Sequence, residues 1–240
     1  MKLFSWNCRG LGRPRTVRAL KDAIRAFSPR IVCLIETRKK EADGEWIRWK
    51  LGFRSGLSVG CRGQSGGLAL LWDDLEVSVM SFSRNHIDAI VKEQNEFRLT
   101  LFYGELAVSN RVLGWNLLRR LGEDRGLPWV VIGDFNEVVC LSEVQGGRGR
   151  NDWQMENFRR VLSDCQLSDL RYSGYPFTYS NRREGEAKVR ARLDRAVANV
   201  DWRRIFPSTT VNHVQLHASD HQLLVLDTDN RCIMRKKKLF

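Results

Sequence analysis

Polar residues follow apolar runs at points where buried strands are expected to end. The clearest case is "VVIGDFN" (130–136), where an apolar strand reaches Gly133 and is followed by Asp134 and Asn136. Turn chemistry is one explanation, because Gly, Asp and Asn are common where strands stop. Side chains at alternate positions of an extended chain also point the same way, which allows both to act on one bound group.

Other expected strands end in complementary polar groups, namely Asn7 in "FSWN", Glu36 in "CLIE", Asp194 in "ARLDR", and Asp220 and His221 before the run "QLLVL". If these ends meet at one edge, they form an acidic pocket with a histidine in a protein of net charge +12. Clustered carboxylates repel one another unless a cation lies among them. Oxygen donors of this kind favour Mg²⁺, with Mn²⁺ as the alternative.

Such a pocket suits metal-assisted hydrolysis of a phosphate ester. The metal polarises a phosphate oxygen, a carboxylate activates water, and an imidazole or amide stabilises the transition state. A histidine needs a partner that fixes its tautomer, and a second aspartate is the usual one. A lone S-D-H is more often a turn or cap, and a lone strand-end Glu is more often a surface residue. It is their joint occurrence in this order that favours a catalytic site.

The amino-acid composition restricts the classes of binding partner and the cellular compartments that we expect for this protein. The excess of 40 Lys and Arg over 28 Asp and Glu favours a polyanionic partner, nucleic acid first and an acidic membrane surface second. The six cysteines form no C-x-x-C pair, which is typical of a reducing compartment, and Cys33 and Cys140 lie in apolar runs where buried thiols are expected. No stretch approaches the ~20 apolar residues of a membrane span, and the first residues lack a secretory apolar segment. We therefore expect a nuclear or cytoplasmic protein without a membrane partner.

The pattern of elements predicts one domain of mixed α and β structure. Four strand-like runs succeed one another between residues 66 and 103, which suggests an antiparallel meander. Two packed sheets flanked by helices would bury this many strands. The expected strands are 2–7, 31–36, 66–72, 76–82, 86–91, 96–103 and 128–133, with shorter ones within 175–180, 188–197, 208–216 and 221–228; the expected helices are 15–27, 41–53, 110–121 and 153–162.

The ordered motifs "SWNCRG", "LIET", "FYG", "GDFN", "RLDR" and "SDH" resemble the endonuclease/exonuclease/phosphatase superfamily. Within it, "SWNCRGLG" and "NHIDA" are most similar to the apurinic-type endonuclease domain of plant LINE (non-LTR) retrotransposons. The resemblance extends from Asn7 to His221. It implies an α+β fold, a four-layer α/β/β/α sandwich of two packed, mainly antiparallel sheets, as in deoxyribonuclease I-like proteins.

The resemblance also implies roles for individual residues. Glu36 would be the principal metal ligand, with Asn7 beside it and Asp220 close to the metal. For catalysis, Asp134 would activate the attacking water, Asn136 and Tyr103 would contact the scissile phosphate, and Asp194 would support His221 as it stabilises the pentacovalent state. His86, His213 and His217 receive no role, because nothing in the sequence gives them a partner.

Two departures from repair-type relatives put strong abasic-site activity in doubt. Arg9 stands where such relatives carry an Asp, and "YGELAVSNR" lacks their Pro-Asn pair after the tyrosine.

We expect the loops that lie over the groove of bound DNA to supply the DNA contacts. Their candidates are Arg148, Arg150, Thr178, Arg182 and Arg183, the arginines as phosphate contacts rather than base readers.

The resemblance implies a Mg²⁺-dependent DNA endonuclease that leaves a 3′-hydroxyl, as in target-primed retrotransposition. Two alternatives remain open at this point: a phosphatase of the superfamily that acts on a small or lipid phosphate, and a nucleic-acid-binding retroelement relic that no longer cuts. We expect a monomer with an endonuclease domain at 1–230 and a basic, solvated tail at 231–240. The 240 residues leave no room for a polymerase, so we expect a stand-alone remnant or a fragment that acts with the reverse transcriptase region of a longer element.

Overall fold

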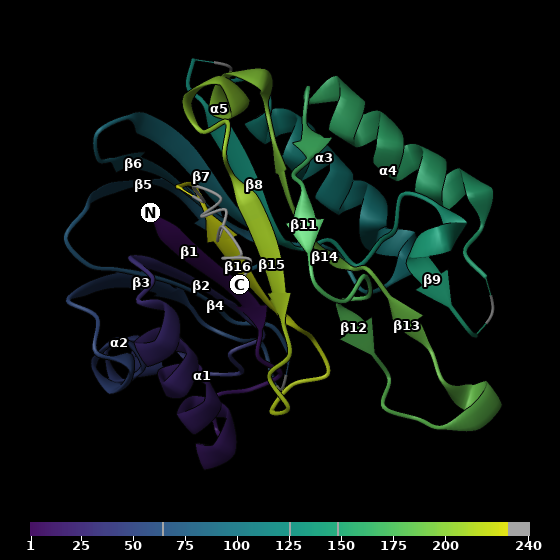
Figure 1. Cartoon of the computed structure of the whole chain (residues 1–240), viewed down its shortest axis with the longest axis horizontal. Helices are drawn as coiled ribbons and strands as arrows, with labels where there is room; N and C mark the ends of the chain where they lie inside the picture. Colours follow the sequence, from purple (N-terminus) through teal and green to yellow (C-terminus); the bar gives the residue numbers. More distant parts are fainter. Residues whose placement is uncertain (64, 125, 148, 230–240) are drawn as a thin grey trace, which may run out of the picture.

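The computed structural model describes residues 1–63, 65–124, 126–147 and 149–229. Two sheets carry the architecture. The first has seven strands in the order β11-β15-β16-β1-β2-β4-β3, and the second has six in the order β10-β14-β8-β7-β6-β5. A third, three-stranded sheet of short strands, β12-β13-β9, extends from the second half of the chain (Figure 1).

The seven-stranded sheet consists of β1 (Lys2–Asn7), β2 (Ile31–Ile35), β3 (Ser55–Val59), β4 (Leu68–Trp72), β11 (Tyr172–Ser173), β15 (Thr210–Val214) and β16 (Leu223–Asp227). The six-stranded sheet consists of β5 (Glu76–Ser83), β6 (His86–Lys92), β7 (Glu96–Tyr103), β8 (Trp129–Asp134), β10 (Ser168–Asp169) and β14 (Asp194–Ala198). The small sheet consists of β9 (Val144–Gln145), β12 (Tyr179–Ser180) and β13 (Arg190–Ala191).

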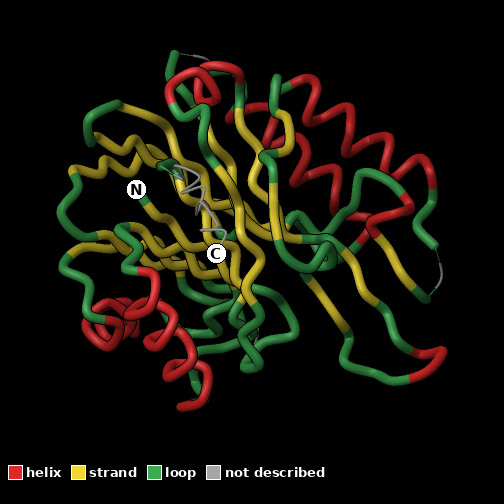
Figure 2. The backbone as a smooth tube through the Cα atoms, in the orientation of Figure 1, coloured by secondary structure: helices red, strands yellow, loops and turns green. Residues whose placement is uncertain are grey.

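Helices cover the outer faces of the two main sheets (Figure 2). The α-helices are α1 (Pro14–Phe27), α2 (Gly44–Leu51), α3 (Arg111–Leu121), α4 (Asp152–Asp164) and α5 (Val200–Ile205). Short 3₁₀ turns are η1 (Glu41–Asp43), η2 (Val108–Asn110), η3 (Leu141–Glu143) and η4 (Gly185–Ala187). Among the described residues, no helix has the length and apolar character needed to cross a membrane.

Three apolar clusters hold the four layers together. The central one lies between the two sheets and joins side chains such as Leu3 and Ile35 to Leu99 and Ile132. A second cluster packs α1 and α2 on the outer face of the seven-stranded sheet, and a third packs α3 and α4 on the six-stranded sheet. This arrangement is the predicted α/β/β/α sandwich, and its mainly antiparallel sheets confirm the expected fold class.

Two expectations from the sequence were wrong in detail, and one strand was missed. The expected meander is shorter, because β4 pairs with β2 and β3 of the other sheet and only β5, β6 and β7 are consecutive neighbours. Strand β3 went unnoticed, since its sequence, "SGLSV", has little apolar character. Cys33 is buried as expected, but Cys140 is exposed because the strand has already ended at Asp134.

Two parallel pairings bring the strand ends to one edge. Strand β1 runs parallel to β2, and β7 runs parallel to β8, so their carboxyl ends lie together. The antiparallel strands β14 and β16 begin where these neighbours end. In the register of the six-stranded sheet, Tyr103 and Asp194 both lie opposite Asp134. The topology therefore delivers the predicted site residues to the same end of the sandwich.

A buried ion-pair cluster fixes the segment around Asp194. Arg192 and Arg195 each pair with both Glu143 and Asp169, at 2.6–2.9 Å between nitrogen and carboxylate oxygen. The Arg195 side chain is fully buried, so it depends on these carboxylates for its solvation. Glu143 belongs to η3, and the cluster consequently joins the 141–145 segment to the strand that carries Asp194.

We expect Glu143→Ala to lower the free energy of unfolding by about 3 kcal/mol, because it leaves two buried guanidinium groups with half of their counter-ions. The matched control is Glu156→Ala, which removes a glutamate that also pairs with two arginines, but on the exposed surface of α4. Such exposed pairs are worth less than about 1 kcal/mol. Urea unfolding of both variants measures the difference, and equal losses would contradict the role of the buried cluster.

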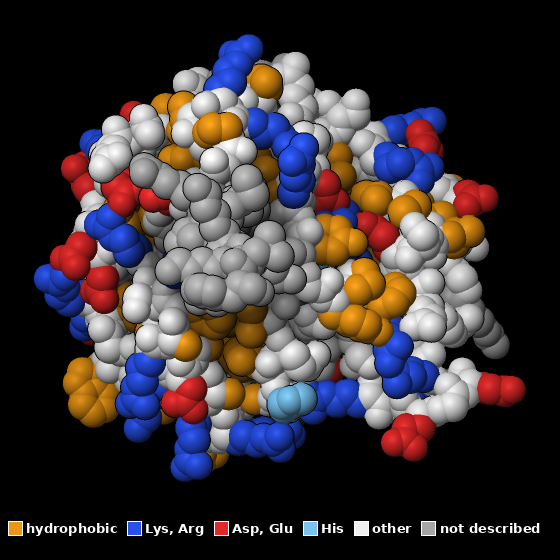
Figure 3. Space-filling model, in the orientation of Figure 1, with side chains coloured by type: hydrophobic (Ala, Val, Ile, Leu, Met, Phe, Trp, Pro, Cys, Tyr) orange, Lys and Arg blue, Asp and Glu red, His pale blue; other side chains and the backbone are white. Residues whose placement is uncertain are grey.

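Basic side chains occur on several sides of the face that Figure 3 shows. Figure 3 shows Lys and Arg side chains along the lower edge of the molecule, between α1 and the hairpin of β12 and β13. The expected basic segment 231–240 lies outside the described residues.

Candidate active site

The eight residues predicted to act in catalysis or metal binding all lie at the edge where the strands end. Seven of them are buried, and Asp220 is partly exposed. They come from both main sheets and from the segments that follow or precede their strands: Asn7, Glu36, Tyr103, Asp134, Asn136, Asp194, Asp220 and His221. The structure thus gathers into one site the residues that the sequence scatters over more than two hundred positions.

Asp134 lies at the centre of this site. Its Oδ2 accepts a hydrogen bond of 2.9 Å from Asn7 Nδ2, and its Oδ1 accepts one of 2.9 Å from the backbone amide of Asn136. Gly133 makes this position possible, because a Cβ atom there would lie 2.0 Å from the carbonyl oxygen of Phe102 on β7. Burial disfavours the charged carboxylate, and the nearby Asp194 adds to the effect, so the pKa of Asp134 rises to about 6.

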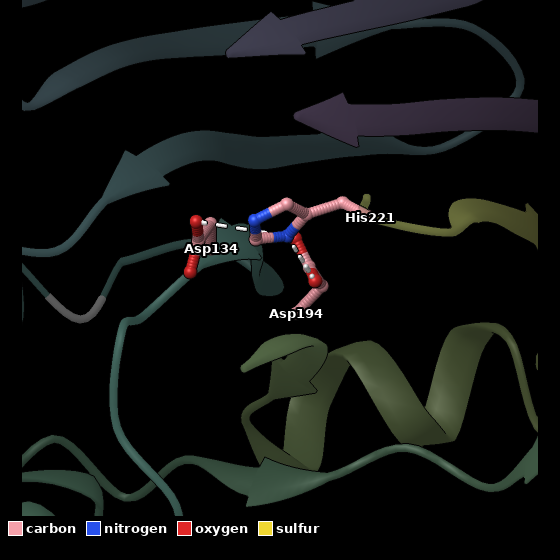
Figure 4. Close-up of side chains that lie close together, drawn as sticks. All are labelled: Asp134, Asp194 and His221. Carbon is pink, nitrogen blue, oxygen red and sulfur yellow. Dashed lines mark hydrogen bonds and ion pairs between the residues drawn. The ribbon is translucent and has the colours of Figure 1, made fainter. Parts of the chain in front are cut away.

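His221 and Asp194 form a buried pair beside Asp134 (Figure 4). His221 Nδ1 lies 2.8 Å from Asp194 Oδ2 and 3.9 Å from Asp134 Oδ2. Burial opposes protonation of the imidazole, but the two carboxylates outweigh it and raise the pKa of His221 to about 9. At neutral pH the ring is therefore an imidazolium that can donate hydrogen bonds from both nitrogens.

Glu36 collects donors from both sheets. Its Oε1 accepts from Tyr103 Oη at 3.0 Å and from Asn7 Nδ2 at 3.4 Å, and its Oε2 accepts from Arg38 at 2.9 Å. Burial alone would raise the pKa of Glu36, but the Arg38 hydrogen bond and the charge of Arg9 outweigh it and lower the pKa. The carboxylate is accordingly held in its charged form.

Asn7 and Tyr103 contact the carboxylates rather than open space. Asn7 turns its amide nitrogen toward Glu36 and Asp134, and its Oδ1 accepts from the backbone amide of Arg9. Burial and the charge of Glu36 raise the pKa of Tyr103 far above its usual range, so the hydroxyl stays a donor. Both residues orient acidic groups in this structure; their predicted contacts to metal and to phosphate stay predictions.

The backbone is strained at this site. Four residues of the edge, Arg9, Glu36, Arg38 and Asn136, have φ between 50° and 54°, a left-handed conformation that non-glycine residues adopt at a cost of about 1–3 kcal/mol each. Such strain persists only where surrounding contacts hold it in place. Its concentration around Glu36 and Asp134 supports a functional role for the edge.

The donor set fits a hard divalent cation. Carboxylate oxygens of Glu36 and Asp220 face a common cationic group, the Arg9 guanidinium, at 3.6 and 3.4 Å. Atoms of Asp134, Asp194 and His221 also lie within 4.8 Å of one another, as metal ligands can. The Nδ1 atom of His221 is already engaged by Asp194, so we favour Glu36 and Asp220 as the carboxylates that would hold Mg²⁺ or Mn²⁺, as the sequence predicted.

Unlike the eight residues of the acidic site, the residues predicted to contact DNA do not lie together, and they differ in exposure and in their partners. Arg183 is exposed on the hairpin, whereas Arg182 donates to the backbone carbonyls of His217 and Ser219 and so ties the hairpin to the segment of Asp220. Arg150 is partly buried, 3.5 Å from buried Glu137. Arg148 lies outside the described residues.

The prediction that Thr178 contacts DNA was wrong. Its side chain is fully buried, and its hydroxyl accepts hydrogen bonds from the backbone amides of Leu193 and Asp194, at 3.0 and 2.9 Å. Thr178 therefore positions the strand start that carries Asp194. The sequence offered no signal for this role, because the two segments meet only in the folded chain.

An open groove of about 680 Å³ runs from the hairpin to Asp220. Cationic side chains, among them Arg15, Arg183, Lys188 and Arg190, line it together with aromatic rings. Tyr179 belongs to this lining, and its ring centre lies 5.0 Å from that of His221. The acidic site therefore opens into a basic channel, an arrangement suited to a polyanion whose backbone must approach a metal.

Sequence reasoning missed several neighbours of the site. Ser219 accepts from the amide of His221 and donates to the carbonyl of Asn7, which joins the segment before β16 to the end of β1 within the seven-stranded sheet. Arg38 and Tyr179 were not singled out, and Arg9 was noted only as a departure from a family pattern. His86 and His213 do have partners, the hydroxyls of Ser81 and Ser83 for His86 and the carbonyl of Tyr175 for His213, and both are consistent with structural roles.

Comparison with known proteins agrees with this geometry. The model of the endonuclease/exonuclease/phosphatase family matches residues 4–221, and the chain belongs to that family. Its members are hydrolytic nucleases and phosphatases, so the chain falls among phosphodiester and phosphate-ester hydrolases. No curated protein sequence matches the chain.

Three solved structures have the same fold. A 3′-5′ exonuclease (NExo) from Neisseria meningitidis is 16% identical with a TM-score of 0.70, over 95% of this chain and 99% of that one. The endonuclease domain of TRAS1, a telomere-specific non-LTR retrotransposon, is 16% identical with a TM-score of 0.65, over 94% and 97%. The AP endonuclease LMAP from Leishmania major is 14% identical with a TM-score of 0.68, over 94% and 86%.

The ionisation of His221 can be measured directly. The chain has four histidines, so the His221 resonance is assigned by comparison with His221→Gln. We expect it to titrate near pH 9, and Asp194→Asn to lower that pKa because the carboxylate that favours the imidazolium is lost. Two-dimensional NMR of the ring protons as a function of pH measures both values; a His221 pKa near 6.5 in both proteins would contradict the pair.

The same pair makes stability depend on pH. Because the folded pKa is raised, the stabilisation is fully present below the ordinary histidine pKa of about 6.5 and is lost as the pH rises through about 9. The metal-free protein should therefore lose unfolding free energy over that window. The Asp194→Asn variant should lose less.

Proposed function

We propose that the protein is a metal-dependent DNA endonuclease that nicks one strand and leaves a 3′-hydroxyl. The observation that carries the proposal is the convergence of Asp134, Asn136, Glu36 and the His221–Asp194 pair at one edge, where a basic groove opens. The fold shared with the TRAS1 endonuclease domain supports a retroelement role, in which the freed 3′-hydroxyl primes reverse transcription.

The chain's own residues would divide the reaction between them. Asp134, held by Asn7 and by the Asn136 amide, accepts the proton of the attacking water, whose oxygen bonds to phosphorus as the P–O3′ bond breaks. The leaving O3′ takes a proton from solvent water and becomes the 3′-hydroxyl. Protonated His221, held by Asp194, donates a hydrogen bond to the phosphate and stabilises the pentacovalent state. A bound Mg²⁺ would polarise a phosphate oxygen and offset the developing charge.

Asn136 would position the phosphate. Its Nδ2 donates to the carbonyl of Gly104 at 2.8 Å, which leaves one amide hydrogen for a phosphate oxygen. The buried ion pair of Arg111 with Glu137 fixes the segment that follows Asn136. The amide is thus preorganised before substrate arrives.

The partners and location follow from the same proposal. DNA is the substrate, a reverse transcriptase region of a longer element is the functional partner, and the endonuclease acts as a monomer in the nucleus or cytoplasm. Gel filtration tests the monomeric state, since a monomer elutes near 27.8 kDa.

The activity is tested by conversion of supercoiled plasmid to the nicked circle with Mg²⁺ or with EDTA. We expect nicking only with Mg²⁺, and a loss of about a thousandfold for Asp134→Asn and for His221→Ala, because each removes a group that acts in the transition state. Asp201→Asn is the matched control, an exposed aspartate of α5 that pairs with Arg204. It should nick at the wild-type rate.

Each other outcome selects one of the remaining functions. A folded wild-type protein that binds DNA without nicking would be a retroelement relic. Failure to bind DNA, together with release of phosphate from small or lipid phosphates, would identify a phosphatase.

The groove makes a separate prediction about salt. The plot of log affinity against log salt concentration has a negative slope, which becomes steeper by about 0.9 for each phosphate that the protein contacts. Loss of one contact in Arg183→Ala should therefore make the slope shallower by about 1. Arg204→Ala, an equally basic change on exposed α5, should leave the slope unchanged. Fluorescence anisotropy with duplex DNA in EDTA measures both, and equal slopes for the two variants would remove the hairpin from the DNA interface.

A further inference from the structure

The guanidinium of Arg9 lies between two of the carboxylates predicted to hold the metal. Its Nη1 is 3.6 Å from Glu36 Oε1, and its Nε is 3.4 Å from Asp220 Oδ1. Among the described residues, Arg9 is the only cationic side chain paired with both of them. The two carboxylates come from the strands on either side of β1, since Glu36 follows β2 and Asp220 precedes β16.

The backbone commits Arg9 to this place. Arg9 has φ near 50°, and its amide donates to Asn7 Oδ1, so the turn that presents Arg9 also orients Asn7 toward Glu36 and Asp134. A strained turn that serves both residues at once places a positive charge where the acidic site opens. The conformation of this turn thus fixes the position from which the Arg9 side chain enters the site.

A divalent cation and the guanidinium cannot occupy this position together. Both are positive, and both would take the same faces of Glu36 and Asp220, so like-charge repulsion and simple occupancy oppose their coexistence. The Arg9 side chain is 41% exposed, which leaves it free to move outward. Asp220, the second carboxylate that Arg9 contacts, lines the basic groove in which the proposed function places the DNA.

Arg38 provides a useful contrast. It is similarly exposed and also pairs with Glu36, but it contacts the other oxygen, Oε2, at 2.9 Å. No pair between Arg38 and Asp220 occurs in the described part of the chain. Arg38 can therefore stay on Glu36 while Oε1 binds a metal.

We propose that Arg9 is an exchangeable counter-ion: it neutralises Glu36 and Asp220 in the metal-free protein, and the divalent cation displaces it toward a phosphate of the DNA. The inference rests on the proposed function, because the displaced guanidinium needs a phosphate to receive it. It assigns Arg9 a positioning role and makes metal binding and DNA binding cooperative, since each favours the outward guanidinium.

The first test measures Mn²⁺ binding by calorimetry to the full chain without DNA. Arg9→Gln should bind Mn²⁺ up to about fivefold more tightly than the wild type, the fold-change that corresponds to the worth of a partly exposed ion pair, about 1 kcal/mol at most. Arg38→Gln removes the same charge from the same carboxylate and should have a clearly smaller effect. Arg9→Lys, which keeps a charge there, should stay close to the wild type.

Thermal unfolding supplies a readout that does not depend on calorimetry. In EDTA, Arg9→Gln should melt below the wild type because two carboxylates lose their counter-ion. With saturating Mn²⁺ the difference should vanish or reverse. A residue that merely supports the fold would lower the melting temperature equally in both conditions.

The second test asks whether the displaced Arg9 guanidinium contacts the DNA when the metal is bound. In an Asp134→Asn background, which prevents cutting, adding Arg9→Gln should weaken duplex DNA binding about tenfold with Mn²⁺ and little in EDTA. Equal losses in both conditions would show a static DNA contact and overturn the exchange.

The outcomes separate this inference from the endonuclease itself. If the wild type nicks plasmid and binds Mn²⁺, but Arg9→Gln and Arg38→Gln change the affinity equally or not at all, the exchange is wrong and the endonuclease stands. If the wild type binds no Mn²⁺, with Glu36→Gln giving the same blank result, both proposals fail.

Discussion

The balance of charge at the strand ends governs this structure. Four carboxylates, on Glu36, Asp134, Asp194 and Asp220, share one edge of the sandwich; the first three are buried and need partners that offset the cost of burying a charge, whereas Asp220 is partly exposed. Asp194 takes the His221 imidazolium, Glu36 takes arginines and hydrogen-bond donors, and Asp134 receives amides and keeps a raised pKa. The site therefore moves the pKa values of two acids in opposite directions, downward for Glu36 and upward for Asp134.

The same constraint explains why the surrounding architecture is elaborate. Donors must reach each acid from separate parts of the chain, so the site is built where both sheets end and where two parallel strand pairs interrupt mainly antiparallel order. Ser219 joins the segment before β16 to the end of β1, Thr178 holds the start of β14, and the ion pairs of Arg192 and Arg195 with Glu143 and Asp169 hold the residues around that start. Residues that touch no substrate thus determine how well Asp134 and His221 are aimed.

The basic groove complements the acidic site without neutralising it. Arg183, Lys188 and Arg190 line the groove beyond Asp220, whereas Arg9 reaches into the acidic edge itself. A polyanion is attracted by the groove and repelled by the uncompensated acids, so its phosphate can approach only when cations cover the carboxylates. In the proposed exchange, Arg9 connects the affinity for DNA to the occupancy of the metal site.

Most of the fold class and the central site were predictable from sequence. Apolar runs with period two or 3.6 gave most of the strands and the larger helices, and the polar residues at strand ends identified Glu36, Asp134, Asn136 and His221 as partners. Local pattern carries this information because burial of a strand and the polarity of its end are properties of neighbouring residues. Errors arose where pairing is remote: β4 joined the other sheet, Cys140 lay past the end of its strand, and Thr178 turned inward.

What the sequence by itself determined is therefore the inventory of chemistry: the acids, the amides, the histidine, the basic excess and the strands that present them. Only the tertiary structure decided which charge meets which. The partners of Glu36, for example, include a tyrosine 67 positions away and an arginine two positions away, and nothing in the spacing ranks one above the other. Pairings such as Arg9 with Asp220 depend on sheet register and on the turn after β1, and those are set by packing of the whole sandwich.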